Sequence, residues 1–589
     1  MPIAEAPGAP SGDHTIHVDH RARMEILFAI LLGLFLSALD QTIVGTALPT
    51  IVTDLHGNDL YTWVVTIYLL TSTISGPVYG KLSDQFGRKR LLMFGIALFL
   101  IGSALSGLSQ TMEQLIIFRG IQGLGAGALF PISLAVIGDL FSPQERGKYQ
   151  GLFGAVFGIS ALIGPALGGF LTDQVSWHWI FFVNIPIGLV ALYIIGRLLP
   201  AHIQTGVTRA VDYLGVAVFT AALVPILIGL TNAQFSDWTD PFVGGLILLG
   251  AIIGVVFLWV ETRAKEPIVP LGLFRNRTYS ISILATFLAS FGFFGAIIFL
   301  PRWYQIVAGS SATESGYQLL PLLAGLIIGS ILSGQWVSRT GHYKWLTFIA
   351  LITLTGALYL MTNLHADTPT PVLYTWQFIA GLGIGPTMAV FTIIVQNAVP
   401  WQMLGVATSN LTFFRQVGGT VGLAIAGTIF ARTLETQAPT QVANQLLAAG
   451  VPQSQLEQLQ QGFSGAFNLD QITGVGDMGQ RILDSIPPQA QQFVAPYIDY
   501  IVAGIHEAFS LAIANTMYLS MVATAIAAVS ILALREVPLR RTINANSMAA
   551  AKPSSTAEAT PASVPASAAT AGKPEPHTPD THSPKPATD

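Results

Sequence analysis

The chain has 589 residues, of which 52% are hydrophobic and only 10% are charged. Soluble domains usually carry about a quarter charged residues, so this composition excludes an ordinary soluble protein and predicts an all-α polytopic membrane protein. The chain has no cysteine, which excludes disulfides, thiolate metal sites and cysteine catalysis.

Residues 1–23 are mostly polar, and we expect a disordered cytoplasmic N-terminus there. Fourteen apolar stretches follow, each of the about 20 residues that a helix needs to cross a bilayer. No small-residue cleavage site is evident after the first stretch, so we interpret it as a retained helix rather than a signal peptide. The expected transmembrane helices lie near residues 24–48, 61–80, 91–108, 113–138, 149–172, 178–199, 212–231, 241–260, 280–305, 316–338, 345–363, 373–398, 404–431 and 508–535.

The positions of the basic residues predict the orientation. If the N-terminus lies in the cytoplasm, all but five of the 27 lysines and arginines fall on the cytoplasmic side, whereas short outer loops carry aspartates such as Asp54, Asp173 and Asp237. Cytoplasmic loops of membrane proteins are enriched in Lys and Arg. We therefore predict a multi-pass protein of the cell (inner or plasma) membrane with both termini in the cytoplasm.

Two segments outside the apolar stretches have distinctive compositions. Residues 432–507 are polar and Gln-rich and fall on the outer side, where we expect an extracytoplasmic loop between the last two membrane helices. This loop would be a small cap, a partner-docking element or a linker. Residues 542–589 are rich in Ala, Pro, Ser and Thr, a composition typical of a disordered tail, here cytoplasmic.

An internal repeat divides the membrane part into halves. The segment FRGIQGLGAG (118–127) matches WQFIAGLGIG (376–385), so that three glycines recur at an offset of 258. GKLSDQFGRKR (80–90) likewise matches GQWVSRTGHYK (334–344) at an offset of 254. Internal repeats of this kind are common in transporters. We predict a six-helix half at 24–200, two inserted transmembrane helices at 212–260 and a second, pseudo-symmetric six-helix half at 280–535.

The two copies differ in their charged residues. The scaffold glycines recur, but the ionisable side chains of the first copy are largely absent from the second. In the second copy, Ser338 takes the place of Asp84, His342 that of Arg88, Gln377 that of Arg119 and Asn397 that of Asp139.

Asp40 and Arg119 are the candidate proton-coupling residues. From the helical rise, Asp40 lies about 24 Å along the first helix and Arg119 about 10 Å into the fourth, which runs the opposite way, so both fall in the outer half of the membrane. Charged residues inside a membrane are rare and tend to pair. We expect the two side chains to contact each other and Asp40 to take up a proton when they separate. A static ion pair that locks two helices is the alternative interpretation.

The loop between the second and third helices is a candidate cytoplasmic gate. Gly80 permits close approach of helices and Gly87 a tight turn. Asp84 and Arg88 are four residues apart and can engage each other or a neighbouring helix end. Asp139, at the cytoplasmic end of the fourth helix, is a third charged candidate.

These segments resemble the motifs of the major facilitator superfamily. GKLSDQFGRKR resembles its loop between helices 2 and 3, and LIIFRGIQGLGAG (115–127) resembles its fourth-helix motif with a buried arginine. Together with LDQTIVGTALP (39–49), WHWIFFVNIPIG (177–188) and fourteen spans, the pattern resembles that of the drug:proton antiporters with fourteen transmembrane helices. Ser160 stands where the antiporter motif of the fifth helix usually has glycine. The residues that match this motif are Gly164, Pro165, Gly168 and Gly169.

The resemblance implies a major-facilitator fold and a proton-coupled antiporter that exports amphipathic drugs or toxic small molecules by alternating access. It implies a coupling role for Asp40 and Arg119, and a gate that closes against the second half. Relatives that export dications often carry further acids in the second half. Here the thirteenth helix carries Arg415 instead, which leaves anionic, zwitterionic and neutral substrates open. The implied gate residues are Gly80, Asp84, Gly87, Arg88 and Asp139.

We expect a substrate cavity between the halves near the midplane. Aromatic side chains and scattered amides suit a loosely selective apolar site, although each candidate would serve equally well in a helix–helix hydrogen bond. The candidates are Gln41, Tyr68, Gln122, Tyr304, Gln305, Gln377, Gln396, Asn410, Phe413 and Arg415.

Other classes of protein fit the sequence less well. No GxxxxGK[ST] motif occurs, which argues against an ATP-driven pump, and no catalytic or metal-ligating cluster lies in the spans, which argues against an enzyme. A dedicated exporter of a metabolite, lipid or siderophore, or a transporter-derived sensor or accessory protein, is the alternative. We expect no cofactor and no metal, since the proton gradient supplies the energy. The expected partners are the lipid bilayer, protons and an amphipathic small molecule, with no nucleic acid, and the expected state is a monomer.

Overall fold

The computed structural model describes residues 19–56, 60–200, 212–233, 238–452, 478–485, 491 and 494–539, and the regular structure in these ranges is entirely helical. The predicted tail at 542–589 and residues 1–18 of the predicted N-terminus lie outside the described residues. The prediction of disorder is wrong for residues 20–23, because α1 (His20–Asp54) begins there. Arg21 and Glu25, one turn apart, pair at 3.0 Å on its surface and support this early start.

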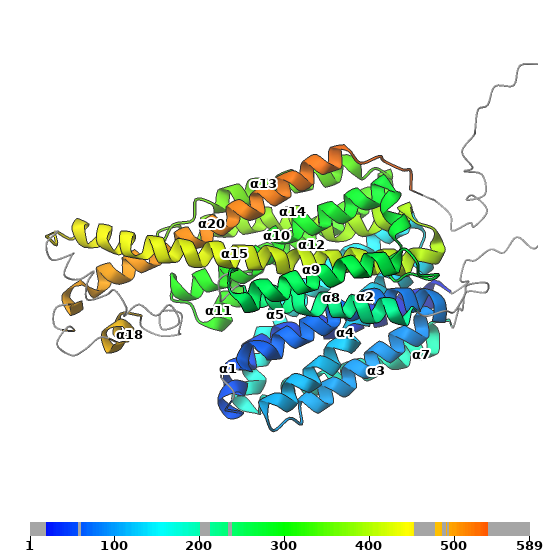
Figure 1. The fold of residues 1–589 in the computed structure, drawn as a ribbon, viewed down its shortest axis with the longest axis horizontal. Helices are drawn as coiled ribbons and strands as arrows, with labels where there is room; N and C mark the ends of the chain where they lie inside the picture. The colour runs from blue at the N-terminus through cyan, green and yellow to red at the C-terminus, as the bar shows by residue number, and fades with distance from the viewer. Residues whose placement is uncertain are drawn as a thin grey trace, which may run out of the picture. The chain divides into compact units, whose positions relative to one another are not determined.

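The helices follow the predicted order of two halves separated by an inserted pair (Figure 1). The first half continues with α2 (Tyr61–Phe86), α3 (Arg88–Ser106), α4 (Met112–Leu140), α5 (Pro143–Gln174), α6 (Trp179–Phe182) and α7 (Asn184–Leu198). The inserted pair is α8 (Tyr213–Asn232) and α9 (Pro241–Glu261), followed by η2 (Leu271–Arg275). The second half comprises α10 (Arg277–Ile306), α11 (Ala312–Tyr317), α12 (Leu320–Thr340), α13 (Lys344–Met361), α14 (Thr370–Ala398), η3 (Trp401–Met403), α15 (Leu404–Ala448), α18 (Met478–Ser485), η4 (Ala495–Tyr497) and α20 (Ile498–Leu532).

Thirteen helical stretches of the described chain are long and apolar enough to cross a membrane. The helix α2, of 26 residues, occupies the place of the predicted second span but is not among them. The protein is therefore a multi-pass membrane protein, and the total of fourteen spans stays a prediction.

The helices α15 and α20 differ from the predicted spans in length. We expected membrane helices at 404–431 and 508–535, but α15 continues to Ala448 and α20 already begins at Ile498. The two extensions run side by side (Figure 1) and share a small apolar cluster with α18, centred on Leu446, Ile501 and Ile505. The two ends of the predicted loop at 432–507 are therefore helical. Its residues 453–477 lie outside the described residues.

The internal repeat is present in the packing as well as in the sequence. In the first copy, a side chain at Gly123 or Gly127 would overlap α2, whereas one at Gly125 would overlap α3. In the second copy the three matching glycines, Gly381, Gly383 and Gly385, meet α12, α13 and α12 in the same order. Glycine thus allows α4 and α14 to lie against their neighbours at backbone contact distance, and this close packing builds the frame of each half.

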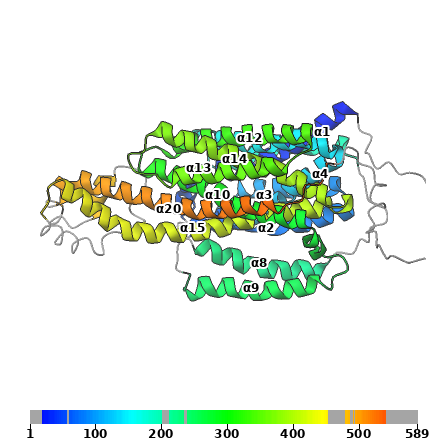
Figure 2. The same cartoon turned by 90° about the horizontal axis from the view of Figure 1, so that it is seen from above.

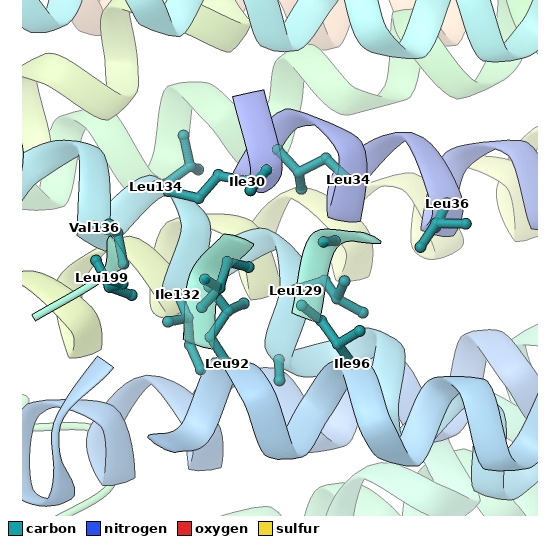
Figure 3. Packing of buried hydrophobic residues seen from close by; sticks show 14 of the residues in the cluster. Ile30, Leu34, Leu36, Leu92, Ile96, Leu129, Ile132, Leu134, Val136 and Leu199 are labelled. Carbon is teal, nitrogen blue, oxygen red and sulfur yellow. The ribbon is translucent and has the colours of Figure 1, made fainter. Parts of the chain in front are cut away.

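Each half has its own apolar core. In the first half α1, α3 and α4 interlock through leucine and isoleucine side chains such as Leu34, Ile96 and Leu129, all at most 2% exposed (Figure 3). The second half contains two further clusters between α10, α13, α14 and α20. Each of these three clusters therefore lies within one half of the described chain.

The inserted helices α8 and α9 pack against each other at one edge of the bundle (Figure 2). They reach the rest of the protein through α2 and α15, one helix from each half. Phe219 of α8 packs on Phe413 of α15 with ring centroids 5.4 Å apart. Lys81 of α2 binds Glu266, which follows α9, at 2.6 Å. The inserted pair therefore covers the line along which the two halves meet.

Candidate functional site

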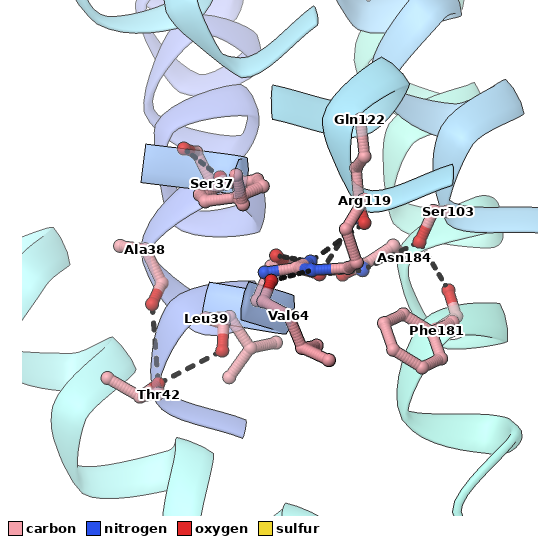
Figure 4. Close-up of polar contacts among 12 residues, drawn as sticks. Ser37, Ala38, Leu39, Thr42, Val64, Ser103, Arg119, Gln122, Phe181 and Asn184 are labelled. Atoms are coloured by element: carbon pink, nitrogen blue, oxygen red, sulfur yellow. Dashed lines mark hydrogen bonds and ion pairs between the residues drawn. The ribbon is translucent and has the colours of Figure 1, made fainter. Parts of the chain in front are cut away.

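Asp40 belongs to a buried polar cluster in the first half, together with Arg119, Gln122 and Asn184, which are labelled in Figure 4. Nη1 of Arg119 lies 2.5 Å from one of its carboxylate oxygens. Gln122 and Asn184 donate hydrogen bonds of 2.8 and 3.2 Å to the other oxygen. The carboxylate is 0% exposed and the arginine 1%. The predicted contact between the two charged residues is therefore present. The two amides donate the further hydrogen bonds that a buried carboxylate needs in place of water.

The guanidinium of Arg119 contacts several groups besides the carboxylate. Besides Asp40, it donates to the side-chain oxygen of Gln122 at 2.8 Å and, through Nε, to the carbonyl of Val64 at 3.4 Å. Its Cζ lies 4.2 Å from the centre of the Tyr68 ring, a cation–π distance. The hydroxyl of Tyr68 in turn lies 3.1 Å from that of Ser37. A continuous set of contacts thus connects the ion pair to the middle of α1.

Asn184 and Ser103 belong to this cluster but were not among the predicted site residues. The amide of Asn184 donates to both Asp40 and the Ser103 hydroxyl, which donates to the carbonyl of Phe181 at 2.8 Å. Asn184 is 0% exposed at the start of an apolar helix. An asparagine in such a place needs a partner, and this was the signal that could have identified it.

The predicted gate residues meet at one end of the bundle, which we call the gate end. Asp84 accepts hydrogen bonds from the backbone N–H groups of Gly405 and Val406, at 3.0 and 2.9 Å. These groups begin α15 of the second half, so the carboxylate caps a helix N-terminus, where negative charge is favourable. Arg88 pairs with Asp84 at 2.5 Å and with Asp139 at 3.0 Å. The charged cluster therefore joins the two halves.

Glycines allow the halves to touch at the gate end. A side chain at Gly80 of α2 would overlap Ser409 and the Gly405 carbonyl of α15. On the opposite side of the bundle, Gly147 of α5 and Gly334 of α12 meet backbone to backbone. Gly147 and Gly405 are 258 residues apart, which is the offset of the repeat, so these two contacts are symmetry-related. Gly87, with φ of +95°, supplies the turn between α2 and α3 that we predicted.

Gln396 lies in the gate end rather than in a cavity. Its side-chain oxygen accepts from Arg146 at 3.4 Å and from Gln150 at 3.2 Å, and its amide donates to the carbonyl of Leu134. Arg146 also donates to the carbonyls of Gly138 and Phe141. This second polar cluster likewise joins α14 to the first half.

A third acid at the gate end belongs to the second half alone. Glu536, after α20, accepts hydrogen bonds from the backbone N–H groups of Tyr343 and Lys344, at 2.6 and 3.2 Å, where α13 begins. Burial opposes its ionisation, but these two N–H groups and the nearby His342 outweigh burial and lower the pKa of Glu536 below its usual 4.5.

The residues of the predicted antiporter motif pack α5 against α1. Side chains at Gly164 or Gly168 would overlap Thr42 and Ile43 of α1, whereas Gly169 faces open space. Pro165 lies inside the helix. The hydroxyl of Ser160, the one departure from the motif, lies 3.5 Å from a carbonyl of α1. The small residues of the motif therefore allow α1 and α5 to pack closely.

A cavity of about 260 Å³ lies between the halves, and we call it the central cavity. Helices α1, α2, α4 and α5 of the first half and α10, α12, α14 and α15 of the second half contribute to its lining. Three of the predicted candidates line it: Gln41, Phe413 and Arg415. Its volume is just below the about 300–1,000 Å³ of typical small-molecule pockets.

The other seven candidates are not among the residues that line the central cavity. Tyr68 and Gln122 contact Arg119, and Gln396 belongs to the gate end. The remaining four make hydrogen bonds within the second half: Gln305 to Ser315, Asn410 to Tyr279, and Gln377 to Tyr304. Buried amides satisfy each other or the backbone more often than they face a cavity, as the alternative interpretation held.

Gln377 and Tyr304 form the neutral counterpart of the ion pair. Gln377 takes the place of Arg119 in the repeat and donates to the Tyr304 hydroxyl at 2.8 Å, between α14 and α10. The second half thus keeps the helix–helix contact of the first half but not its charge.

Asp40 does not line the central cavity, although its neighbours on α1 do. Ser37, Ala38, Gln41 and Thr42 face the cavity, whereas Asp40 faces α4 and α7. The two faces of one helix therefore carry the buried carboxylate and the cavity wall.

Comparison with known proteins agrees with this architecture. The family model of the Major Facilitator Superfamily matches residues 30–423. The multidrug transporter protein MdtP of Bacillus subtilis is 41% identical over 409 residues, covering 69% of this chain and 75% of that protein. Multidrug resistance protein 3 of the same organism is 38% identical over 405 residues, covering 69% and 79%.

Among solved structures, the proton:xylose symporter XylE superposes with a TM-score of 0.56 over 90% of this chain and all of its own. At 13% sequence identity, this likeness concerns the fold alone. The family match, the relatives and the two repeated halves around a cavity lead to one conclusion. The chain is a transporter, not an enzyme, and it belongs to the major facilitator superfamily.

Proposed function

We propose that the protein is a proton-coupled antiporter that exports amphipathic small molecules by alternating access, in the cell membrane with both termini cytoplasmic. The relatives are named for multidrug transport and resistance. The observation that carries the proton coupling is the fully buried Asp40 carboxylate, held by Arg119, Gln122 and Asn184 behind the wall of the central cavity.

The contacts of α1 suggest how a proton on Asp40 acts on the cavity and the gate. Protonation removes the charge that holds Arg119 and thereby loosens α1 from α4. The helix α1 rests on α5 through Gly164 and Gly168, and α5 carries Gly147 into the gate end. A shift of α1 is thus passed to the contact between α5 and α12 that closes the halves at that end.

The energy of one proton is sufficient for substantial accumulation. A gradient of one pH unit supplies about 1.4 kcal/mol per proton, and a membrane potential of 100 mV adds about 2.3 kcal/mol per charge. Together they support a concentration ratio of a few hundred for a neutral substrate.

Reconstituted vesicles test this proposal. Wild-type protein should transport amphipathic dyes when a pH gradient is imposed, and a protonophore should abolish this transport. Asp40→Asn should lose the response to pH but retain downhill dye exchange, since the cavity wall is untouched. Asp173→Asn, which removes an exposed carboxylate at the end of α5, is the matched control and should behave as wild type. Full pH-driven transport by Asp40→Asn would refute the coupling role.

A further inference from the structure

Arg415 of α15 is a buried cation without a partner in the described part of the chain. It lines the central cavity and is 8% exposed. Its Nη2 atom is buried without a hydrogen bond. Among the described residues, its guanidinium forms no salt bridge with an acid and no cation–π contact with an aromatic ring. A buried charge without a partner raises the free energy of the protein. A ligand that supplies the missing negative charge would therefore bind favourably.

The other buried arginines of the described chain show that this is an exception. Arg88 has two aspartates, Arg119 has Asp40, and Arg146 has two backbone carbonyls and Gln396. All three lie in helix–helix contacts, whereas Arg415 lies at a cavity wall. The fold therefore satisfies its structural arginines and leaves the cavity arginine unpaired.

The lining of the central cavity carries positive but no negative charge among the described residues. Among the described residues that line it, none is an aspartate or glutamate, and Arg415 is the only charged side chain. Much of the remaining wall is aromatic, with Phe130, Phe153 and Phe157 in edge-to-face contact on one side and Phe293 and Phe294 on the other. Uncharged hydrogen-bonding groups lie beside the arginine, including Gln416, whose oxygen accepts from Thr73 at 2.8 Å.

We propose that the substrates of this cavity are amphipathic organic monoanions, in which a carboxylate or a similar acidic group binds Arg415 and an aromatic body fills the phenylalanine-lined space. This inference rests on the proposed export function and names its substrate class. A guanidinium presents a planar fork that matches a carboxylate with two parallel hydrogen bonds. The single positive charge with no nearby acid disfavours cations, and it selects one negative group rather than two.

The charge of such a substrate also affects the energetics of export. Exchange of one entering proton for one leaving monoanion moves two unit charges in the same electrical sense, whereas exchange for a neutral molecule moves one. A membrane potential that is negative inside therefore drives the export of the anion more strongly than that of a neutral analogue of the same size.

Binding to the purified full-length protein tests the inference without any gradient. Three probes share one environment-sensitive fluorophore and differ in charge: dansylglycine, its methyl ester and dansylcadaverine, which are anionic, neutral and cationic. We expect wild type to bind dansylglycine most tightly. Arg415→Gln should weaken dansylglycine binding about tenfold or more, the usual effect of losing a hydrogen bond to a charged group, and should leave the ester unchanged. Arg415→Lys keeps the positive charge but loses the planar guanidinium. Its affinity for dansylglycine should therefore lie between those of wild type and Arg415→Gln.

The ester serves as the folding control, since its binding by Arg415→Gln shows an intact cavity. Equal affinity of wild type for the three probes, a preference for dansylcadaverine, absence of dansylglycine binding, or an anion preference that survives in Arg415→Gln would each overturn the assignment. The proposed export function fails by a different result, namely an intact anion preference in the binding assay together with no pH-driven transport in vesicles.

Discussion

The cap that Asp84 places on α15 gives a quantitative prediction about the gate. Asp84→Ser installs the residue that the second copy of the repeat has at this position, Ser338. The serine cannot supply the two carboxylate oxygens that accept from Gly405 and Val406. Arg88 keeps Asp139 at 3.0 Å, so the buried guanidinium does not become unpaired. The substitution thus removes mainly the contact between halves.

The magnitude follows from the geometry of this cap. A charged cap on a partly buried helix N-terminus contributes about 1–2 kcal/mol. In the proposed alternating access, opening the gate end would break this contact, so the contribution would stabilise the closed arrangement alone. Its loss should lower the ratio of closed to open molecules about 5- to 30-fold. A protein that is almost entirely closed would then show a readily measured open fraction.

Spin-label distances provide the assay. The chain has no cysteine, so labels can be placed without background at two exposed arginines of the gate end, Arg90 in the first half and Arg339 in the second. We expect a single short distance in wild type and an added longer one in Asp84→Ser. Ser338→Ala is the matched control at the equivalent position, and it should leave the distribution unchanged. An unchanged distribution in Asp84→Ser, or an equal shift in both variants, would refute the reasoning.

Two further predictions concern packing and pH. Gly147→Val should abolish transport because its side chain meets the Gly334 backbone when the gate end closes, whereas Gly169→Val, which faces open space, should retain it; transport assays in vesicles compare the two, and equal activity contradicts the role of this contact. Glu536→Gln should lower the melting temperature at pH 7, because the lowered pKa of Glu536 means that its stabilisation is present above about pH 4.5 and is lost as the pH falls through the folded-state pKa. Melting curves at pH 7 and pH 3.5 test this, since a constant difference between variant and wild type would exclude Glu536 ionisation as the cause.

The sequence was sufficient to predict the parts of the site that depend on charge or on repetition. Charges are rare in the membrane spans, so two of them at the same depth predicted the contact between Asp40 and Arg119. The glycines recur at fixed offsets, and their contacts recur with them. Both signals are strong because a misplaced charge or a misplaced side chain at these positions is costly.

The positions of uncharged polar residues could not be predicted in the same way. An amide such as Gln122 or Gln396 makes similar hydrogen bonds to a helix, a charge or a ligand, so its presence in a span does not show which face it occupies. The length of α15 escaped prediction for another reason. Its last turns are polar, and hydropathy cannot distinguish a helix outside the membrane from a loop; here the apolar contact of Leu446 with α20 stabilises the helix.

The placement of Asp40 and of the central cavity on different faces of α1 has a consequence for how the cavity wall can vary. A substitution at Phe413 would change the cavity wall at a distance from the ion pair, whereas one at Ser37 would also affect Tyr68, whose ring packs on Arg119. The parts of the wall away from Ser37 can therefore vary while the contacts of Asp40 stay the same. By the same separation, an inhibitor lodged in the cavity would displace substrate by direct overlap, whereas it would affect Asp40 only through a movement of α1.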